Sequence, residues 1–189
     1  KNNFALCKKN DLLDFYEPGL PTEGNREASQ AQVYGDSFSS PDSNIFHLAG
    51  NTSLQRLDQL LRADDLTYDA DSTAYDAAGH VRYQERGMLF SADTMKGTTD
   101  PEYGVADNVQ YQLLTSRGNG VASQAIMLDQ DRDKLRNVTY STCDLHRRVW
   151  EIDAKTMTMD RDEGVGRAHN VTMRVKGVPF LWLPYMRFP

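Results

Sequence analysis

The sequence predicts an all-β fold, a jellyroll built from stacked hairpins, from three observations. A pattern recurs about every 29 residues along the 189-residue chain, and within each repeat apolar and polar residues alternate in steps of two. Gly, Asn and Asp cluster between the alternating runs. A period of two places every second side chain on one face, which is typical of strands, and the clusters between the runs predict the turns that join them into hairpins.

Two independent markers define the repeat. The first is Asn or His followed by a β-branched residue, and its copies recur with this period at Asn51, His80, Asn108, Asn137 and Asn170. The second is centred on Ala and keeps nearly the same period, with copies at Ala63, Ala92, Ala122 and Ala154. The pair Gly35-Asp36 lies one repeat before Ala63 and is interpreted as an earlier, weaker copy.

A shift in the alternation accompanies each Ala marker. Phe90 and Ala92 are followed by Met95, so the apolar positions move by one residue. Such a shift reverses the side chains unless the strand bulges or bends at that point. Each repeat should therefore supply two strands of about 8 residues, and recurrent bends at one level should curve the sheets into a roll.

The chain divides into three segments. Residues 1–32 are rich in Pro, Gly and polar residues and lack alternation, so we expect a flexible N-terminal arm. Residues 33–176 carry the repeats of the jellyroll domain, and residues 177–189 lead out of it through three prolines. Because hairpins stack in one direction, the first repeat has an unpaired edge. We expect a docking edge within residues 33–49, at Ile45, Phe46 and Leu48.

Composition argues against several classes of protein. The net charge is −6 and the basic residues form only scattered pairs, which disfavours nucleic-acid binding and the clamping of lipid headgroups. The strongest apolar run, residues 178–183, is interrupted by Pro179 and is far shorter than the roughly 20 residues of a membrane-spanning helix. The chain lacks an initial Met and a leader, so we expect a processed chain or a piece of a longer one.

No catalytic or metal-binding set of residues stands out, so we expect neither an enzyme nor a cofactor. Residues 129–133 begin like a calcium loop, but Lys134 and Tyr140 occupy the positions of its Gly and Glu, which favours a hairpin turn. The two cysteines, Cys7 and Cys143, lie far apart in the sequence and belong to no C-x-x-C pair. The residues themselves leave open two free thiols or a disulfide in an oxidising compartment.

The inward-facing apolar residues have two interpretations, a simple sandwich core or the lining of a groove for lipid chains. The pliable Met side chains among them favour a surface that adapts to its ligand. The lining residues that we predict are Val81, Tyr83, Phe90, Val109, Tyr111, Val138, Tyr140, Trp150, Ile152, Met157 and Met173.

Residues 61–69 and 78–81 resemble the OstA-type domain of lipopolysaccharide-transport proteins. The stretches that are specifically similar to the LptD family of outer-membrane lipopolysaccharide-assembly proteins are 137–143, 150–155 and 171–185. The resemblance implies a V-shaped jellyroll on the periplasmic face of the outer membrane. Its open edge would continue the strand ladder of an LptA-like periplasmic jellyroll, and its interior would shelter the acyl chains of lipopolysaccharide.

The resemblance also implies features outside this sequence. Residues 177–189 would lead into the first strands of an outer-membrane barrel, through which an LptE-like lipoprotein would be a partner. Cys7 and Cys143 would form disulfides with cysteines at the far end of that barrel.

The expected function is passage of lipopolysaccharide to the barrel. The alternative is an adaptor that recruits partners by strand addition without binding lipid. A sugar-binding or hydrolytic sandwich is disfavoured because the aromatic residues follow the inward phase.

Overall fold

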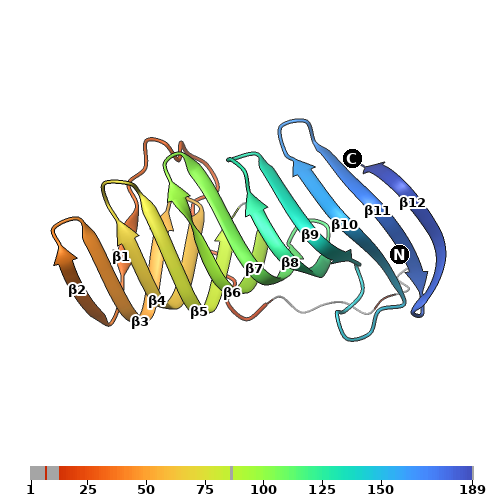
Figure 1. The fold of residues 1–189 in the computed structure, drawn as a ribbon, viewed down its shortest axis with the longest axis horizontal. Helices are drawn as coiled ribbons and strands as arrows, with labels where there is room; N and C mark the ends of the chain where they lie inside the picture. The colour runs from red at the N-terminus through yellow and green to blue at the C-terminus, as the bar shows by residue number, and fades with distance from the viewer. Residues whose placement is uncertain (1–6, 8–12, 86, 189) are drawn as a thin grey trace.

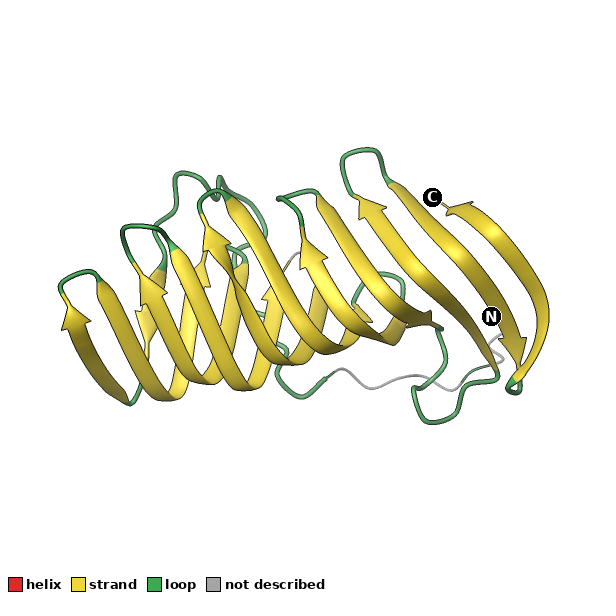
Figure 2. Cartoon of the chain, viewed as in Figure 1, coloured by secondary structure: helices red, strands yellow, loops and turns green. Residues whose placement is uncertain are grey.

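The computed structural model describes residues 7, 13–85 and 87–188, which form strands and loops without a helix (Figure 2). The strands are β1 (Gln32–Tyr34), β2 (Ser37–Asp42), β3 (Ile45–Arg56), β4 (Gln59–Asp69), β5 (Ala74–Glu85), β6 (Met88–Thr99), β7 (Glu102–Leu113), β8 (Asn119–Met127), β9 (Arg132–Tyr140), β10 (Trp150–Asp160), β11 (Val165–Val175) and β12 (Val178–Phe188). The predicted all-β jellyroll is confirmed.

The strands form one antiparallel sheet that follows the order of the chain. From β3 to β12 each strand pairs with its neighbours in sequence, and β1 and β2 share the outer edge of β3 (Figure 1). We call the turns after β3, β5, β7, β9 and β11, with the strand ends that flank them, the first rim, and the turns after β4, β6, β8 and β10, with their flanking strand ends, the second rim. The first rim includes residues 57–58 and 114–118, and the second rim includes residues 70–73, 100–101 and 161–164.

The Asn and His markers lie in the middle of strands, where each strand bends. Their φ angles are positive, for example 46° at Asn51 and 54° at Asn108. Asn tolerates this left-handed conformation better than most residues, which explains why the repeat contains it. Strand pairing shifts register at the same level, as between Ala78 and Val81. The predicted bends are confirmed, and most strands are longer than expected because each continues through its bend into a second layer.

Cross-strand hydrogen bonds fix these bends. They join Asn51 Nδ2 to Asp36 Oδ2 at 2.7 Å, His80 Nδ1 to Asp64 Oδ2 at 2.6 Å, Asn108 Nδ2 to Asp93 Oδ2 at 2.7 Å, and Asn137 Nδ2 to Ser123 Oγ at 2.9 Å. The pair Gly35-Asp36 therefore belongs to the repeat, as predicted, because Asp36 occupies the same position in the earliest bend. The sequence marker is a structural device that folds the sheet into a V.

The hydrophobic core lies between the two layers of the bent sheet. Leu61, Val81 and Phe90 are among its most buried side chains, at most 1% exposed. Residues on both sides of each bend contribute, because the bend absorbs the one-residue shift in the alternation. Leu54–Ala63, which could be mistaken for a helix in sequence, is the β3–β4 hairpin.

Residues 13–31, which we call the strap, lie against the sheet. The Leu13 amide donates to Gln112 Oε1 at 2.9 Å, and the Glu17 amide donates to Gln84 Oε1 at 2.8 Å. Gln84 and Gln112 are the cross-strand partners of Leu89, which is 0% exposed. We expected a flexible arm over residues 1–32. The described part is anchored by side-chain amides that composition does not reveal, and residues 1–6 and 8–12 lie outside the described residues.

The last strand differs from the expectation that residues 177–189 leave the domain. Residues 178–188 form β12, which pairs with β11 along most of its length. Its Pro179 and Pro184 are tolerated because β12 is an edge strand, where a missing N–H leaves no partner unpaired. Residue 189 lies outside the described residues.

The free edge lies within the expected range of residues 33–49, but not at the three residues named for it. Ile45, Phe46 and Leu48 lie on β3, which is paired on one side with β2 and on the other with β4. Leu48 is only 5% exposed. The free edge is formed by β2 and β1, because the chain before Ile45 folds back to form a further strand. The short spacing of residues 32–42 concealed this strand in the sequence.

Candidate functional site, an apolar cavity in the roll

A cavity of about 370 Å³ lies between the two layers, toward the C-terminal end of the roll. The residues that line it belong to β7, the β7–β8 turn, β9, β10 and β12: Tyr111, Leu113, Ser116, Leu135, Tyr140, Ile152, Met157, Met159, Met186 and Phe188. The volume is within the range of ligand pockets, and most of the lining is apolar. The cavity can shelter hydrocarbon, and its two inward Met side chains from β10 can adapt to different chains.

Strand pairing explains why these side chains converge. Ile152 is paired with Tyr140 before the bend of β10, and Met157 is paired with Leu135 after it. Side chains paired directly across two strands share a face of the sheet. The bend therefore brings two apolar walls to face each other, and the cavity is the space between them.

The inner face remains uncovered beyond the cavity. Met173 lies between Ile152 and Leu181 in the ladder, and Leu181 is 41% exposed. Val175 and Val178, which share this face, are 43% and 65% exposed. The C-terminal end of the interior is therefore open to its surroundings, and we call β10–β12, which border the cavity, the open half.

The predicted groove residues separate into three groups. Those packed in the closed core, at most 3% exposed, are Val81, Tyr83, Phe90, Val109 and Val138. Those lining the cavity are Tyr111, Tyr140, Ile152 and Met157. Trp150 and Met173 are half-buried on the same face, with the Trp150 ring 6.0 Å from that of Tyr140. The sequence predicted one continuous groove, whereas the structure shows a filled core followed by a cavity.

Several lining residues were not predicted. Leu113 and Met159 continue the same alternation and could have been included on that basis. Met186 and Phe188 were missed because their segment was interpreted as leaving the domain. They line the cavity because β12 pairs with β11.

Charged side chains close the interior in β1–β9, which we call the closed half. Arg26 of the strap is 1% exposed and its guanidinium binds Asp58 Oδ1 and Oδ2 at 2.7 and 2.6 Å. It also binds Glu85 at 3.0 Å and Glu102 at 2.7 Å. Asp58 and Glu85 belong to the first rim, whereas Glu102 belongs to the second. Arg26 therefore joins the two rims across the mouth of the roll.

A second guanidinium extends this closure toward the cavity. Arg161 of the second rim binds Glu85 at 2.8 Å and Asp133 at 2.5 Å. We call Arg26, Asp58, Glu85, Glu102, Asp133 and Arg161 the clasp. Asp133 and Met159 line the same small gap, so the clasp ends beside the cavity. No regularity of the sequence indicated that these residues would meet, because they come from the strap, from two turns and from the ends of three strands.

The clasp holds more carboxylates than guanidinium groups. Burial raises the pKa of Asp133 to about 7, which attraction to Arg161 only partly offsets, while the negative charge of Glu85 raises it further. Burial also raises the pKa of Glu102, against the opposing effect of Arg26. Asp133 Oδ1 is buried without a hydrogen-bond partner among the described residues. The clasp is consequently sensitive to protonation and to the loss of either Arg.

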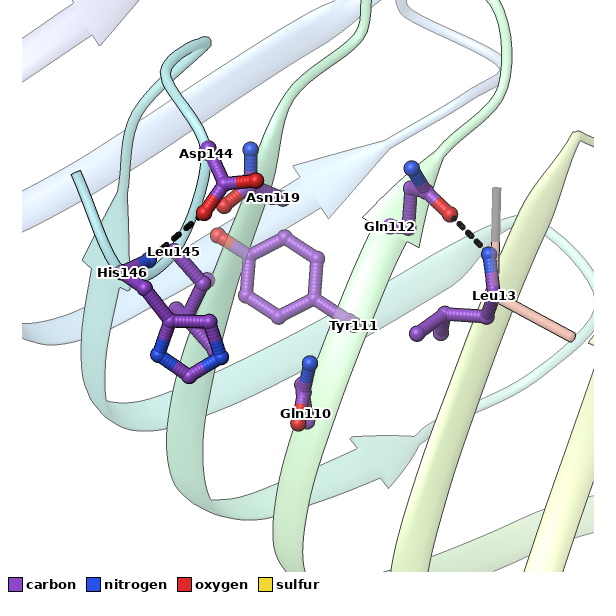
Figure 3. A pocket seen from close by; sticks show the side chains of 9 residues that line it. Leu13, Gln110, Tyr111, Gln112, Asn119, Asp144, Leu145 and His146 are labelled. Atoms are coloured by element: carbon purple, nitrogen blue, oxygen red, sulfur yellow. Dashed lines mark hydrogen bonds between the residues drawn. The ribbon is translucent and has the colours of Figure 1, made fainter. Parts of the chain in front are cut away.

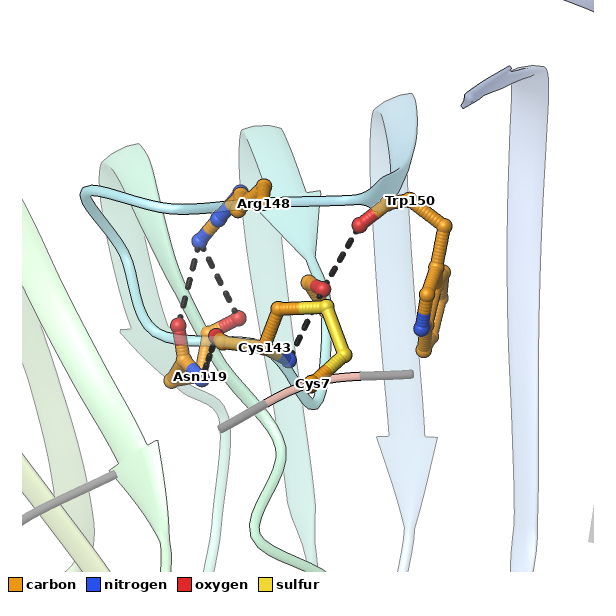
Figure 4. Close-up of a disulfide and its surroundings, with 6 residues drawn as sticks. Cys7, Asn119, Cys143, Arg148 and Trp150 are labelled. Atoms are coloured by element: carbon orange, nitrogen blue, oxygen red, sulfur yellow. Dashed lines mark hydrogen bonds between the residues drawn. A yellow bond between two sulfur atoms is a disulfide. The ribbon is translucent and has the colours of Figure 1, made fainter. Parts of the chain in front are cut away.

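The two cysteines are bonded to each other (Figure 4). Cys143 lies in the β9–β10 loop, where its carbonyl accepts a hydrogen bond from Asn119 Nδ2 at 2.7 Å. The resemblance implied instead that Cys7 and Cys143 each bridge to a cysteine outside this sequence. Within the chain the pairing is internal, because Cys7 lies beside the β9–β10 loop that carries Cys143.

A smaller pocket of about 130 Å³ lies where the strap passes this loop (Figure 3). Leu13, Tyr111, Asn119 and His146 are among its lining residues. Its polar lining makes it a poor site for hydrocarbon.

In the described part of the chain, no group of three or more His, Cys, Asp and Glu side chains is placed to hold a metal ion, and no helix is long and apolar enough to cross a membrane.

Comparison with known proteins identifies relatives, although no family model matches the chain. The chain is 34% identical over 192 residues to the LPS-assembly protein LptD of Xanthomonas campestris pv. campestris (strain 8004), which covers 99% of this chain. It is a relative of the LptD proteins. The LptD of Xylella fastidiosa (strain Temecula1 / ATCC 700964) is 33% identical over 191 residues. The resemblance to LptD seen in the sequence is thereby confirmed.

The chain spans about a quarter of the length of these LptD relatives, 23% and 24% respectively. Among solved structures, it is similar to LptH, described as the LptA homologous periplasmic component of the conserved lipopolysaccharide transport device from Pseudomonas aeruginosa. That match has a TM-score of 0.44 and 10% identity, and covers 80% of this chain and 97% of the other.

Proposed function

We propose that this chain is the lipid-sheltering domain of a lipopolysaccharide-assembly protein at the periplasmic face of the outer membrane. The observation that carries the proposal is the apolar cavity of about 370 Å³ in the open half. Acyl chains of lipopolysaccharide occupy this cavity, and the headgroup remains outside. The relationship to LPS-assembly proteins supports this choice of lipid over others.

The two ends of the roll suit the entry and exit of a lipid. At one end the β1–β2 edge is unpaired, and all residues of β2 are exposed, including Phe38 at 61%. An LptA-like jellyroll adds its strand ladder to this edge, which joins two interiors. At the other end the inner face beside β12 is open. Lipid leaves there toward the barrel of the whole protein, to which an LptE-like lipoprotein binds.

Photo-crosslinking tests the proposal. A photoreactive amino acid at Ile152 or Met159 should capture lipopolysaccharide in cells, because both side chains line the cavity. The matched control is Thr158, the neighbour of Met159 on the opposite face of β10. Equal capture from Thr158 and Met159 contradicts the proposal.

The free edge favours a second candidate function, an adaptor that recruits partners by strand addition and binds no lipid. Uptake of a fluorescent fatty acid separates the two. A conduit binds cis-parinaric acid, and the binding weakens when Ile152→Asp places a charge in the cavity. An adaptor binds the partner jellyroll normally but takes up no fatty acid.

A further inference from the structure

We propose that the strap is a releasable latch that holds the closed half of the interior shut. Arg26 is the side chain that fastens it. Release of the strap opens the mouth of the roll, between the two rims, to acyl chains. This inference depends on the proposed function, because an interior that receives no lipid has no need to open. It concerns a region that the cavity itself does not include.

The strap is held near the mouth by one buried side chain. Among residues 16–30, all of which the structure describes, Arg26 alone is buried. Its guanidinium contacts three carboxylates, whereas the neighbours Asn25 and Glu27 are exposed. Withdrawal of this side chain removes the carboxylate contacts of the segment at the mouth and leaves the Arg56 contact to the Ser29 carbonyl, while the hydrogen bonds at Leu13 and Glu17 keep the strap attached elsewhere.

The carboxylate site that binds Arg26 is unstable once the Arg26 side chain is withdrawn. Asp58 and Glu85 of the first rim then face Glu102 of the second rim with like charges in a buried site. Arg161 still binds Glu85 and Asp133, and Arg56 still attracts Glu102, so two guanidinium groups then face four carboxylates. Buried carboxylates that lose a cationic partner either take up protons or become hydrated, and hydration requires the rims to separate. The site consequently has two states, closed with Arg26 seated and open with Arg26 released.

Arg56 adds a contact that depends on the same seating. Its Nε donates to the carbonyl of Ser29 in the strap at 3.2 Å, and its Nη1 donates to the carbonyl of Thr99 on the second rim. Arg56 ends β3 on the first rim, so it crosses the mouth in parallel with Arg26. Displacement of the strap removes the Ser29 contact that orients the Arg56 side chain.

The closed half has no room for a lipid chain while the latch is seated. Val81 and Phe90 are 0% and 1% exposed and pack in the core. They follow the same inward phase as the cavity lining and lie on the sheet between the free β1–β2 edge and the cavity. A lipid that enters at that edge must pass them, which requires the walls to separate. The clasp ends at Asp133 beside the cavity, so its opening makes the two spaces continuous.

The test measures the width of the mouth directly. Spin labels on Ser72→Cys and Thr115→Cys, which are exposed positions on opposite rims, report the separation by pulsed electron paramagnetic resonance. In Arg26→Gln the distance distribution should shift to longer values and broaden. The matched control is Arg62→Gln. It removes the ion pair between Arg62 and Glu17 of the strap, which does not span the mouth. Its distribution should equal that of the parent.

A charge-balanced variant keeps the test decisive if loss of Arg26 destabilises the fold. Arg26→Gln combined with Asp58→Asn and Glu102→Gln removes the repulsion, so its distances should return toward those of the parent. Circular dichroism establishes that each variant is folded. Parent-like distances in folded Arg26→Gln, or distances in the charge-balanced variant as long as those of Arg26→Gln, overturn the latch.

Fatty-acid binding separates failure of the latch from failure of the proposed function. The parent should bind cis-parinaric acid in the open half, and Arg26→Gln should bind several-fold more because the closed half becomes accessible. Binding by the parent with no increase in Arg26→Gln contradicts the latch and leaves the conduit intact. Absence of binding in every variant contradicts the conduit, and the spin-label distances then still decide whether Arg26 closes the mouth.

Discussion

The closed and open halves of the roll are made from the same repeat, yet one is a filled core and the other holds a cavity. Both have strands that bend at Asn or His, and both present apolar side chains inward. They differ at the rims. In the closed half Arg26 and its carboxylate partners draw the rims together, whereas in the open half the walls end in apolar side chains such as Met159 and Phe188. An identical strand pattern can therefore form a core or a binding site, depending on contacts at the strand ends.

The largest expected difference between the halves is the cost of removing an inward side chain. Phe90→Ala in the closed half should lower the free energy of unfolding by about 4 kcal/mol, because a filled core leaves a cavity behind. Ile152→Ala, which borders an existing cavity, should cost about 2 kcal/mol. Urea denaturation followed by circular dichroism measures both. Equal costs would show that the cavity is filled by packing in solution.

Loss of the disulfide should come next. Cys7→Ser combined with Cys143→Ser should lower the free energy of unfolding by about 3 kcal/mol, because the bond closes a long loop between residues that are distant in sequence. The bond anchors the N-terminal segment at the open half, whereas Arg26 anchors the strap at the closed half. The spin-label distance across the mouth should therefore remain unchanged. A widened mouth in this variant would mean that the two anchors act together.

Protonation of the clasp should make the closed half sensitive to pH. The pKa of Asp133 is raised to about 7 in the folded chain, from about 4 when unfolded. The folded state then retains a proton that the unfolded state releases, so this contribution to stability is complete below about pH 4 and is lost as pH rises through about 7. Stability measured in urea at pH 5 to 8 should fall less steeply in Asp133→Asn. A parent-like slope in that variant would assign the pH dependence to another group.

The smallest effect should appear at the bends. Asp93→Ala in β6 removes the acceptor for Asn108 and should cost about 1 kcal/mol. Lys155 occupies the corresponding position in β10 of the open half and is exposed, so Lys155→Ala should change stability by less than about 0.5 kcal/mol. Thermal unfolding of the two variants provides the comparison. If Lys155→Ala is the more harmful, the bend of the open half depends on contacts of its own.

The relation between sequence and fold is clearest in the bends. Asn51 and Asn108 were visible as markers because local backbone preference, the apolar phase and the repeat all coincide at these positions. The inward direction of Tyr111, Tyr140 and Ile152 followed from alternation, which is a local property of a strand. The strap, the residues named for the free edge, and β12 were misjudged, since their contacts depend on how the chain folds back and not on a periodic pattern.

The sequence by itself determined the all-β repeat, the level of the bends, the inward face and the relationship to LptD. Each of these depends on residues close together in the chain or on recognisable stretches of it. Only the tertiary structure decided where the interior is closed and where it is open. That outcome depends on Arg26, Glu85, Glu102 and Arg161, which are brought together from four separate segments. Charge pairing across a folded mouth has no period in sequence, because it is set by which turns the bends place opposite one another.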